Sequence, residues 1–171
     1  MNRRHTDRIL RVDQAGEYGA TRIYAGQRAV MGSRAPQAGD IAAMAEQESV
    51  HLARFNALLA RRRVRPTALQ PVWAVAGYAL GVASALVGPK TAMACTAAIE
   101  EEIDRHYTRQ LDELEDSDPE LSALIEEFRG DEREHRETAI AAGAEQAPFY
   151  PLFSGAVRLG CRIAIRLSER I

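Results

Sequence analysis

The sequence predicts an all-α fold, and three observations support this prediction. Apolar residues recur at the helical period through most of the 171 residues. The period-two alternation and the turn dipeptides of β-hairpins do not occur. One arrangement of side chains on two consecutive predicted helices returns in the second half of the chain, after a crossover. Two helix pairs joined in this way are typical of a ferritin-like four-helix bundle, here with two additional helices.

Length and composition narrow the class of protein. A chain of 171 residues is long enough for a substantial core, and a single domain over residues 1–171 is expected. The net charge is −2 and no nucleic-acid-binding motif occurs, so nucleic acid is not an expected partner. Cys95 and Cys161 lack Cys-x-x-Cys spacing and are expected to stay reduced. The N-terminus lacks the apolar stretch of a secretory signal.

The first two helices are expected at residues 6–30 and 40–63. Gly16 and Gly19 weaken the first helix and indicate close packing against a neighbour. Glycine and proline between residues 32 and 39 separate the two helices. A basic run at residues 61–65 complements the C-terminal dipole of the second helix.

Residues 71–89 carry no charge and are nearly long enough to cross a membrane. Pro71 and Pro89 close the segment, while Gly77, Gly81 and several alanines make it only mildly apolar. A short helix, buried or lying at an interface, is therefore expected in preference to a membrane span. Three more helices are expected at residues 91–114, about 119–142 and, after the prolines at 148 and 151, about 154–170.

The repeated feature is a Glu-x-x-His pair preceded by a lone glutamate. Glu48 and His51 follow Glu17, and the second half repeats the set with Glu100, Glu132 and His135; the lone glutamates precede their pairs by 31 and 32 residues. Residues three apart lie on one helix face, so both can bind one ion or two adjacent ions. A single Glu-x-x-His is common on exposed helices, whereas two matched copies predict a two-metal carboxylate site for iron or manganese.

Other side chains near this pattern are candidates for supporting roles. Asp131 is expected to accept a hydrogen bond from His51, and Gln47 to serve His135 in the same way, with ordinary surface positions as the alternative. Tyr107 lies two helical turns after Glu100, and is expected either to line a cavity beside the metals or to be a core residue. His106 falls off that face, and Tyr24, spaced likewise from Glu17, is expected in the core.

Several stretches outside this pattern are similar to a known family. They are residues 11–20 (RVDQAGEYGA), 22–27 (RIYAGQ), 63–67 (RVRPT), 92–96 (AMACT), 100–101 (EE), 106–107 (HY) and 167–170 (LSER). With them the chain resembles the demethoxyubiquinone hydroxylases, di-iron monooxygenases of ubiquinone biosynthesis, over residues 7–171. The resemblance implies two iron ions, dioxygen as co-substrate, NADH as the electron source and a polyprenylated demethoxyquinone or quinol as substrate.

The resemblance also assigns roles to residues. It places the metal ligands at the six positions already named: Glu17, Glu48, His51, Glu100, Glu132 and His135. It gives the pair of His106 and Tyr107 a part in electron or proton delivery beside the metals. A lipid-binding accessory protein and a homo-oligomer are both compatible with the family, and the sequence leaves them open.

A polyprenyl quinone lies in the bilayer, so a peripheral position is expected, at the cytoplasmic face of a bacterial inner membrane or the matrix face of the mitochondrial one. The uncharged segment 71–89 is one candidate membrane-facing surface. The last helix is another, because arginines at 158, 162, 166 and 170 run beside Leu159, Ile163 and Leu167. Alternatively, this helix packs on the bundle and leaves the arginines in water.

Three competing functions remain on the same scaffold. One is another di-iron hydroxylase, acting on a modified tRNA or another lipid. A second is iron storage or peroxide scavenging by a ferritin-like or rubrerythrin-like protein, although the Cys-x-x-Cys iron module of a rubrerythrin does not occur. The third is a structural bundle without metal, which would leave the repeated Glu and His positions to chance.

Overall fold

A computed structural model describes residues 3–115 and 117–171, and within these ranges the protein consists of helices and connecting turns. The elements are α1 (Arg3–Met31), α2 (Ala38–Arg62), α3 (Gln70–Val87), α4 (Pro89–Leu114), α5 (Pro119–Ala141), the 3₁₀ helix η1 (Ala144–Gln146) and α6 (Tyr150–Ser168). The expected all-α fold is therefore confirmed.

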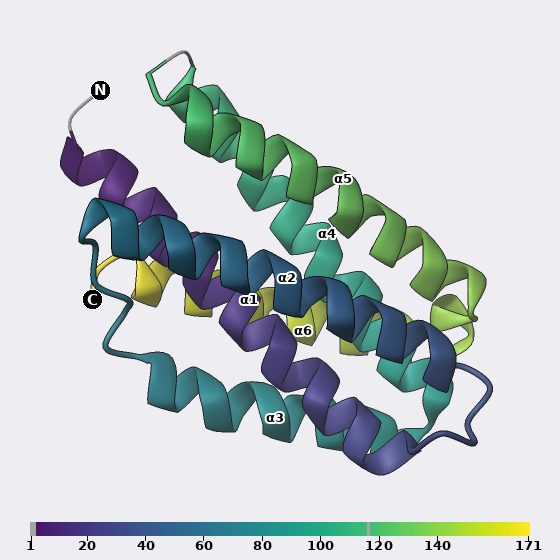
Figure 1. Ribbon diagram of the computed structural model, residues 1–171. Coiled ribbons are helices and arrows are strands. Elements are labelled where there is room, and N and C mark those ends of the chain that lie inside the picture. Colours follow the sequence, from purple (N-terminus) through teal and green to yellow (C-terminus); the bar gives the residue numbers. More distant parts are fainter. Residues whose placement is uncertain (1–2, 116) are drawn as a thin grey trace.

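Four long helices form the bundle, with α1 against α2 and α4 against α5 (Figure 1). The crossover helix α3 lies along α1 and also contacts α4, and α6 packs mainly on α4. Both additional helices thus cover the α1–α4 side of the bundle. Trp73 of α3 donates a hydrogen bond to Ser168 at the end of α6, with 3.0 Å between Nε1 and Oγ, so the two additional helices meet.

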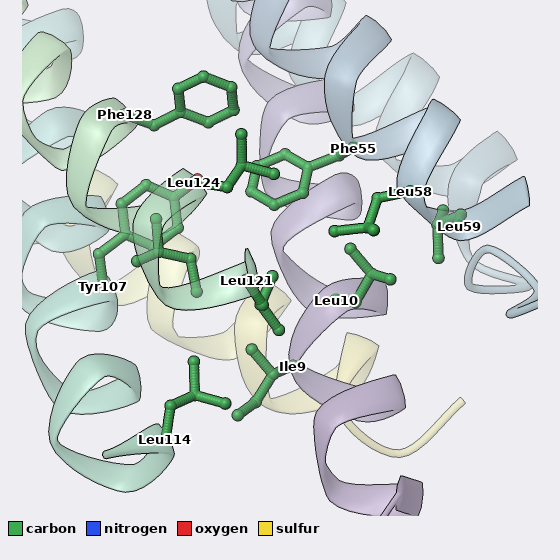
Figure 2. Close-up of a cluster of buried hydrophobic side chains, with 11 residues drawn as sticks. Ile9, Leu10, Phe55, Leu58, Leu59, Tyr107, Leu114, Leu121, Leu124 and Phe128 are labelled. Atoms are coloured by element: carbon green, nitrogen blue, oxygen red, sulfur yellow. The ribbon is translucent and has the colours of Figure 1, made fainter. Parts of the chain in front are cut away.

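Two apolar clusters fill the bundle above and below one polar layer. The first contains large side chains from all four helices, including Leu10, Phe55, Tyr107 and Phe128 (Figure 2). The second lies later along α1 and α5 but earlier along α2 and α4, and it is rich in alanine, with Ala20, Met44, Met93 and Ala139 among its members. The residues between the clusters on each helix are the predicted metal ligands. Burial of both clusters therefore positions this polar layer in the middle of the bundle.

The contact between α1 and α3 is so close that only glycine fits at its centre. A Cβ atom on Gly81 would lie 2.0 Å from the carbonyl oxygen of Ile23, and one on Gly26 would lie 2.3 Å from that of Tyr78. Close packing was expected at Gly16 and Gly19, and Gly19 lies in this contact: a Cβ atom on Gly77 of α3 would be 2.9 Å from the Gly19 carbonyl oxygen. A Cβ on Gly16 or on Gly19 itself would meet no neighbouring atom within 4 Å, so neither position requires glycine.

The start of α6 also differs from the expectation. The helix begins at Tyr150, four residues early, with Pro151 in its first turn. Proline is tolerated there because the first N–H groups of a helix have no intrahelical partner. Likewise α4 begins at Pro89, directly after Gly88, whose φ of 148° ends α3. Pro89 and Pro151, which were interpreted as helix breaks, therefore lie at the starts of helices.

Candidate metal centre

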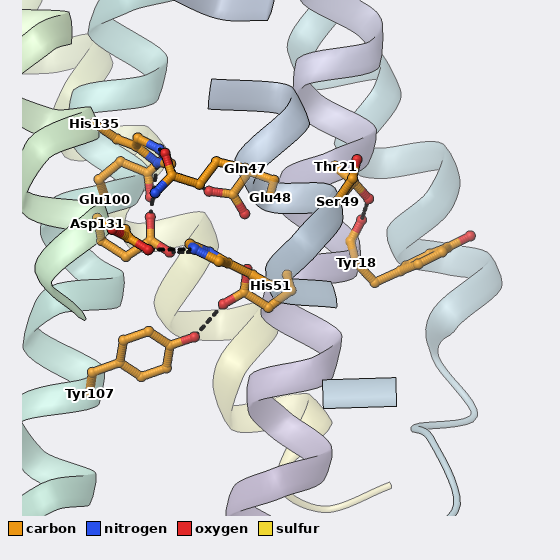
Figure 3. A network of polar contacts seen from close by, with 12 residues as sticks. Tyr18, Thr21, Gln47, Glu48, Ser49, His51, Glu100, Tyr107, Asp131 and His135 are labelled. Atoms are coloured by element: carbon orange, nitrogen blue, oxygen red, sulfur yellow. Dashed lines mark hydrogen bonds and ion pairs between the residues drawn. The ribbon is translucent and has the colours of Figure 1, made fainter. Parts of the chain in front are cut away.

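The six predicted ligands come together from four helices. Glu17 lies on α1, Glu48 and His51 on α2, Glu100 on α4, and Glu132 and His135 on α5. Figure 3 labels four of them: Glu48, His51, Glu100 and His135. Each of these side chains belongs to a residue that is 4% exposed or less. Spacing along the sequence placed each pair on one helix face, and the bundle brings the faces together.

The six residues form two overlapping groups. Glu17, Glu48, His51 and Glu132 make one, and Glu48, Glu100, Glu132 and His135 make the other. Within each group the candidate ligand atoms all lie within 4.8 Å of one another. Glu48 and Glu132, one from each half of the chain, belong to both groups, so two ions held here would share them.

Hydrogen bonding leaves many atoms of this layer unsatisfied. Among the described residues, both carboxylate oxygens of Glu48 and of Glu132 are buried without a hydrogen-bond partner. The same holds for one oxygen each of Glu17 and Glu100, and for Nδ1 of both histidines. Buried polar atoms without partners cost free energy, so proteins seldom keep them without a ligand. Carboxylate and imidazole without thiolate fit iron or manganese better than structural zinc.

The outward nitrogen of each imidazole is held as the sequence predicted. His51 Nε2 lies 2.9 Å from Asp131 Oδ2, and His135 Nε2 lies 3.1 Å from Gln47 Oε1 (Figure 3). Both predicted contacts are confirmed. With Nε2 held outward, Nδ1 faces the carboxylates and lies 3.3 Å from Glu132 in each case. The two rings therefore have the orientation that metal ligation through Nδ1 requires.

Two tyrosines bind glutamates across the bundle. Tyr107 donates to Oε1 of Glu17, and Tyr24 donates to Oε1 of Glu100 at 2.8 Å. Tyr24 is buried as expected, but its contact with the site was missed. The signal was present, because Tyr24 follows Glu17 at the same interval as Tyr107 follows Glu100. Each tyrosine thus leaves one oxygen of its glutamate free to bind an ion.

Burial and mutual repulsion dominate the electrostatics of these side chains. Burial raises the pKa of Glu48, Glu100 and Glu132, and the neighbouring glutamates add to the increase for each. Burial alone lowers the pKa of His51, yet hydrogen bonds and charge from Glu132 and Glu17 raise it to about 10. The cluster therefore holds protons that divalent cations would displace.

His106 lies outside both groups. Its ring centroid is 6.3 Å from that of Tyr107, and its Nε2 lies 2.7 Å from Nε2 of Gln110 and 3.5 Å from Oδ1 of Asp13. The ring is buried, at 7% exposure, although helical geometry placed it off the metal face. Sequence reasoning missed Asp13, which only the packing of α1 on α4 brings to the ring, and Gln110, which lies one helical turn after His106 on α4.

A comparison with known families decides the classification. The profile of the family described as "Ubiquinone biosynthesis protein COQ7" matches residues 4–168. This chain belongs to the COQ7 family. The match spans all six α-helices of the described chain except the first residue of α1, and so includes every residue of the candidate metal centre.

Named COQ7-family relatives come from bacteria and mitochondria. A 3-demethoxyubiquinol 3-hydroxylase of Rhodospirillum rubrum is 56% identical over 165 residues, covering 96% of this chain and 78% of the relative. A human NADPH-dependent 3-demethoxyubiquinone 3-hydroxylase, mitochondrial, is 49% identical over 175 residues, covering all of this chain and 80% of the relative. A 5-demethoxyubiquinone hydroxylase, mitochondrial, of Saccharomyces cerevisiae is 40% identical, covering 96% and 78%.

Proposed function

We propose that this chain hydroxylates the ring of a polyprenylated demethoxyubiquinone or demethoxyubiquinol with dioxygen, as a step of ubiquinone biosynthesis. The names of its relatives supply the substrate class and the reaction. The observation that carries the proposal is the pair of overlapping Glu and His groups, whose inward atoms have no hydrogen-bond partner within the described chain. Family likeness alone would not require these six positions to converge.

The metals are proposed to be two iron ions. One would be held by Glu17 and His51, the other by Glu100 and His135, with Glu48 and Glu132 shared. A pair of such ions supplies the capacity to bind and reduce dioxygen, which carboxylate side chains lack. The surrounding residues have a different part: Tyr24 and Tyr107 keep the terminal glutamates oriented, while the two apolar clusters exclude water from the layer.

The overall reaction fixes what must reach the site. One oxygen atom of dioxygen enters a ring C–H bond and the other leaves as water, which consumes two electrons and two protons. A reduced nicotinamide is proposed as the electron source. The resemblance implied NADH, whereas the names of the mammalian relatives specify NADPH, so the two cofactors are to be compared at equal concentration. His106 and Tyr107 are proposed to carry electrons or protons toward the metals.

A peripheral membrane position is proposed from the apolar outer surfaces of the additional helices. Among the described residues, α3 alone has the length and mean hydropathy of a spanning helix. It packs along α1, however, and Val75 and Leu86 on its outer face are each 70% exposed. On α6, Leu152 and Leu159 are 75% and 55% exposed. A bilayer surface would cover these side chains while the bundle stays outside.

The arginines of α6 divide between two roles. Arg158 contacts Glu101 of α4 at 3.0 Å, so this end of the expected basic stripe binds the bundle. Arg166 and Arg170 are exposed and remain candidates for anionic headgroups. The proposed location is the cytoplasmic face of a bacterial inner membrane, or the matrix face of the mitochondrial one. A lipid-binding accessory protein and a homo-oligomer remain compatible with this arrangement.

Flotation with vesicles containing anionic lipid tests the membrane proposal. Val75→Asp should lower the bound fraction at least about tenfold, since burying one valine contributes roughly 1.5–3 kcal/mol. Val50→Asp, at a 53% exposed valine of α2 on the other side of the bundle, is the matched control and should bind as wild type. Equal binding by both variants would exclude α3 as the membrane-facing surface.

Complementation tests the reaction. The chain is expressed in cells lacking their own demethoxyubiquinone hydroxylation, and extracted lipids are analysed by mass spectrometry. Demethoxyubiquinone should disappear and ubiquinone should form with wild type and with Glu134→Gln, an exposed neighbour on α5. Glu132→Gln should leave the precursor. Persistence of the precursor with soluble, iron-loaded wild type would refute the substrate, and many more than two irons per chain in a large assembly would favour storage.

A further inference from the structure

The two halves of the chain follow one register, and this register extends beyond the metal ligands. Residues 83 apart correspond: Glu17 with Glu100, Tyr24 with Tyr107 and Gln27 with Gln110. The two glutamines make equivalent contacts across the α1–α4 interface. Gln27 Nε2 donates to Thr96 Oγ1 at 3.4 Å, and Gln110 Nε2 donates to Asp13 Oδ1 at 2.6 Å. Thr96 and Asp13 are themselves 83 residues apart.

The two equivalent places on the α1–α4 interface differ in chemistry. One has Asp13 of α1 and His106 of α4, and the other has Thr96 of α4 and Ile23 of α1. Ile23 packs in an apolar cluster with Cys95. The place with the neutral pair packs without an acid or an imidazole. A carboxylate with no exposed side-chain surface, as Asp13 has, is costly to bury. This difference therefore calls for a reason other than folding.

Asp13, Gln110 and His106 form one hydrogen-bonded unit. The Gln110 amide nitrogen carries two hydrogens, one directed at Asp13 Oδ1 at 2.6 Å and one at His106 Nε2 at 2.7 Å. His106 Nε2 also lies 3.5 Å from Asp13 Oδ1. The second oxygen of Asp13 is buried without a hydrogen-bond partner in the described chain. The imidazole is thus held by Gln110 next to a buried carboxylate.

This unit lies between the surface and the Glu17 side of the metal centre. Asp13 is one helical turn before Glu17 on α1, and His106 directly precedes Tyr107, which donates to Glu17. The outer side of His106 lines a small pocket of about 50 Å³. Other residues lining this pocket are Arg8, Ile9, Val12, Arg109, Gln110, Glu113 and Glu169. In the other half, Ile23 at the corresponding position offers no group that can exchange a proton.

We propose that Asp13 is a positioning residue that, through Gln110, fixes the His106 ring at the inner end of this pocket, so that protons consumed in the reaction enter on the Glu17 side. The inference rests on the proposed hydroxylation, which consumes two protons per turnover. A proton taken up by the ring gives an imidazolium whose charge Asp13 offsets. Passing the proton inward breaks the imidazolium N–H bond, forms an O–H bond on the accepting oxygen and returns the ring to neutral.

Asp13→Asn is the main test, because it removes the charge while keeping the shape. Thr96→Val is the matched control in the other half. The double variant Asp13→Asn with Gln110→Glu returns a carboxylate to the unit and is the rescue. Iron per chain, melting temperature, kcat, KM, the pH profile and the solvent deuterium isotope effect are measured for each. Nitrogen-15 NMR of the imidazoles in zinc-loaded full chain, which has four histidines, reports on His106 without turnover.

Asp13→Asn should keep two irons per chain and lower kcat about 100-fold, the lower range for general acid–base catalysis, with KM within about twofold. The groups facing His106 are Asp13 and Arg8 from α1, Arg109, Gln110 and Glu113 from α4, and Glu169 beyond α6. Loss of the Asp13 carboxylate should change the imidazole nitrogen-15 shifts of His106, because Gln110 then holds the ring beside a neutral amide. Thr96→Val should have the kcat of wild type, and the double variant should regain about tenfold in kcat relative to Asp13→Asn.

The proposal would be overturned if iron-loaded Asp13→Asn kept the kcat and pH profile of wild type and the zinc-loaded variant kept the imidazole shifts of wild type. An equal loss of kcat in Thr96→Val would also overturn it. If Asp13→Asn fails to fold, Gln110→Met breaks both amide contacts without adding charge. If Gln110→Met then had the kcat and KM of wild type, the proposal would also be overturned. If wild type itself does not hydroxylate the quinone, the proposed function fails, while the NMR comparison still decides whether Asp13 positions His106.

Discussion

Replacing Asp131 by asparagine is expected to weaken metal binding at one position of the centre and to spare the other. The two histidines differ in what holds their outward nitrogen: a carboxylate at 2.9 Å for His51, an amide oxygen at 3.1 Å for His135. A charged acceptor makes the imidazole more electron-rich and a stronger ligand. The position of Glu17 and His51 should therefore bind the first divalent ion.

The structure sets the size of this effect. Loss of a group that orients a ligating histidine typically costs about 10–100-fold in metal affinity. The Asp131 side chain is 29% exposed, so water screens part of its charge, and the lower end applies. We expect the first dissociation constant of Asp131→Asn to rise about tenfold, equivalent to about 1.4 kcal/mol. The second should stay within about twofold, because His135 keeps its contact with Gln47.

Anaerobic calorimetry of ferrous ion added to the metal-stripped full chain measures both steps. Asp131→Asn gives both histidines an amide partner, so the two binding steps should become closer in affinity. Gln47→Glu, in the opposite half, should instead strengthen the second step. Unchanged affinity at both steps in Asp131→Asn, or a loss confined to the second step, would refute the assignment of the tighter position.

Two further predictions concern stability. Because burial raises the pKa of Glu48 and Glu100 above 4.5, the folded metal-stripped chain binds more protons than the unfolded chain, and its stability should fall as pH rises from about 5 to 8. Calorimetric melting at pH 5.5 and pH 8 checks this, and a higher melting temperature at pH 8 would contradict it. Gly81→Ala should destabilise the protein by at least about 1–3 kcal/mol in urea unfolding, since its Cβ would meet the Ile23 carbonyl at 2.0 Å. Gly16→Ala, where no described atom lies within 4 Å, should stabilise it by up to about 1 kcal/mol, and equal effects would exclude the steric explanation.

Much of the fold could be predicted because helix formation leaves local traces. The apolar period of 3.6 residues marked all six helices, and most ends were within a few residues. The early start of α6 was missed because Pro151 was interpreted as a breaker, although the first helical turn accepts proline. The tightest positions of the contact between α1 and α3, Gly26 and Gly81, were missed, since their role depends on where the partner helix lies.

By itself the sequence determined the helices and the six inward Glu and His positions, because their spacing within a helix and their repetition are local properties. It also predicted the partners of His51 and His135 from the same repeat. Only the tertiary structure decided that Tyr24 binds Glu100 and that Asp13 and Gln110 hold His106. The contacts of Tyr24 with Glu100 and of Gln110 with Asp13 join residues 76 and 97 apart. They depend on the rotation and shift of α1 against α4, which hydrophobic periodicity leaves undetermined and which packing of the two apolar clusters selects.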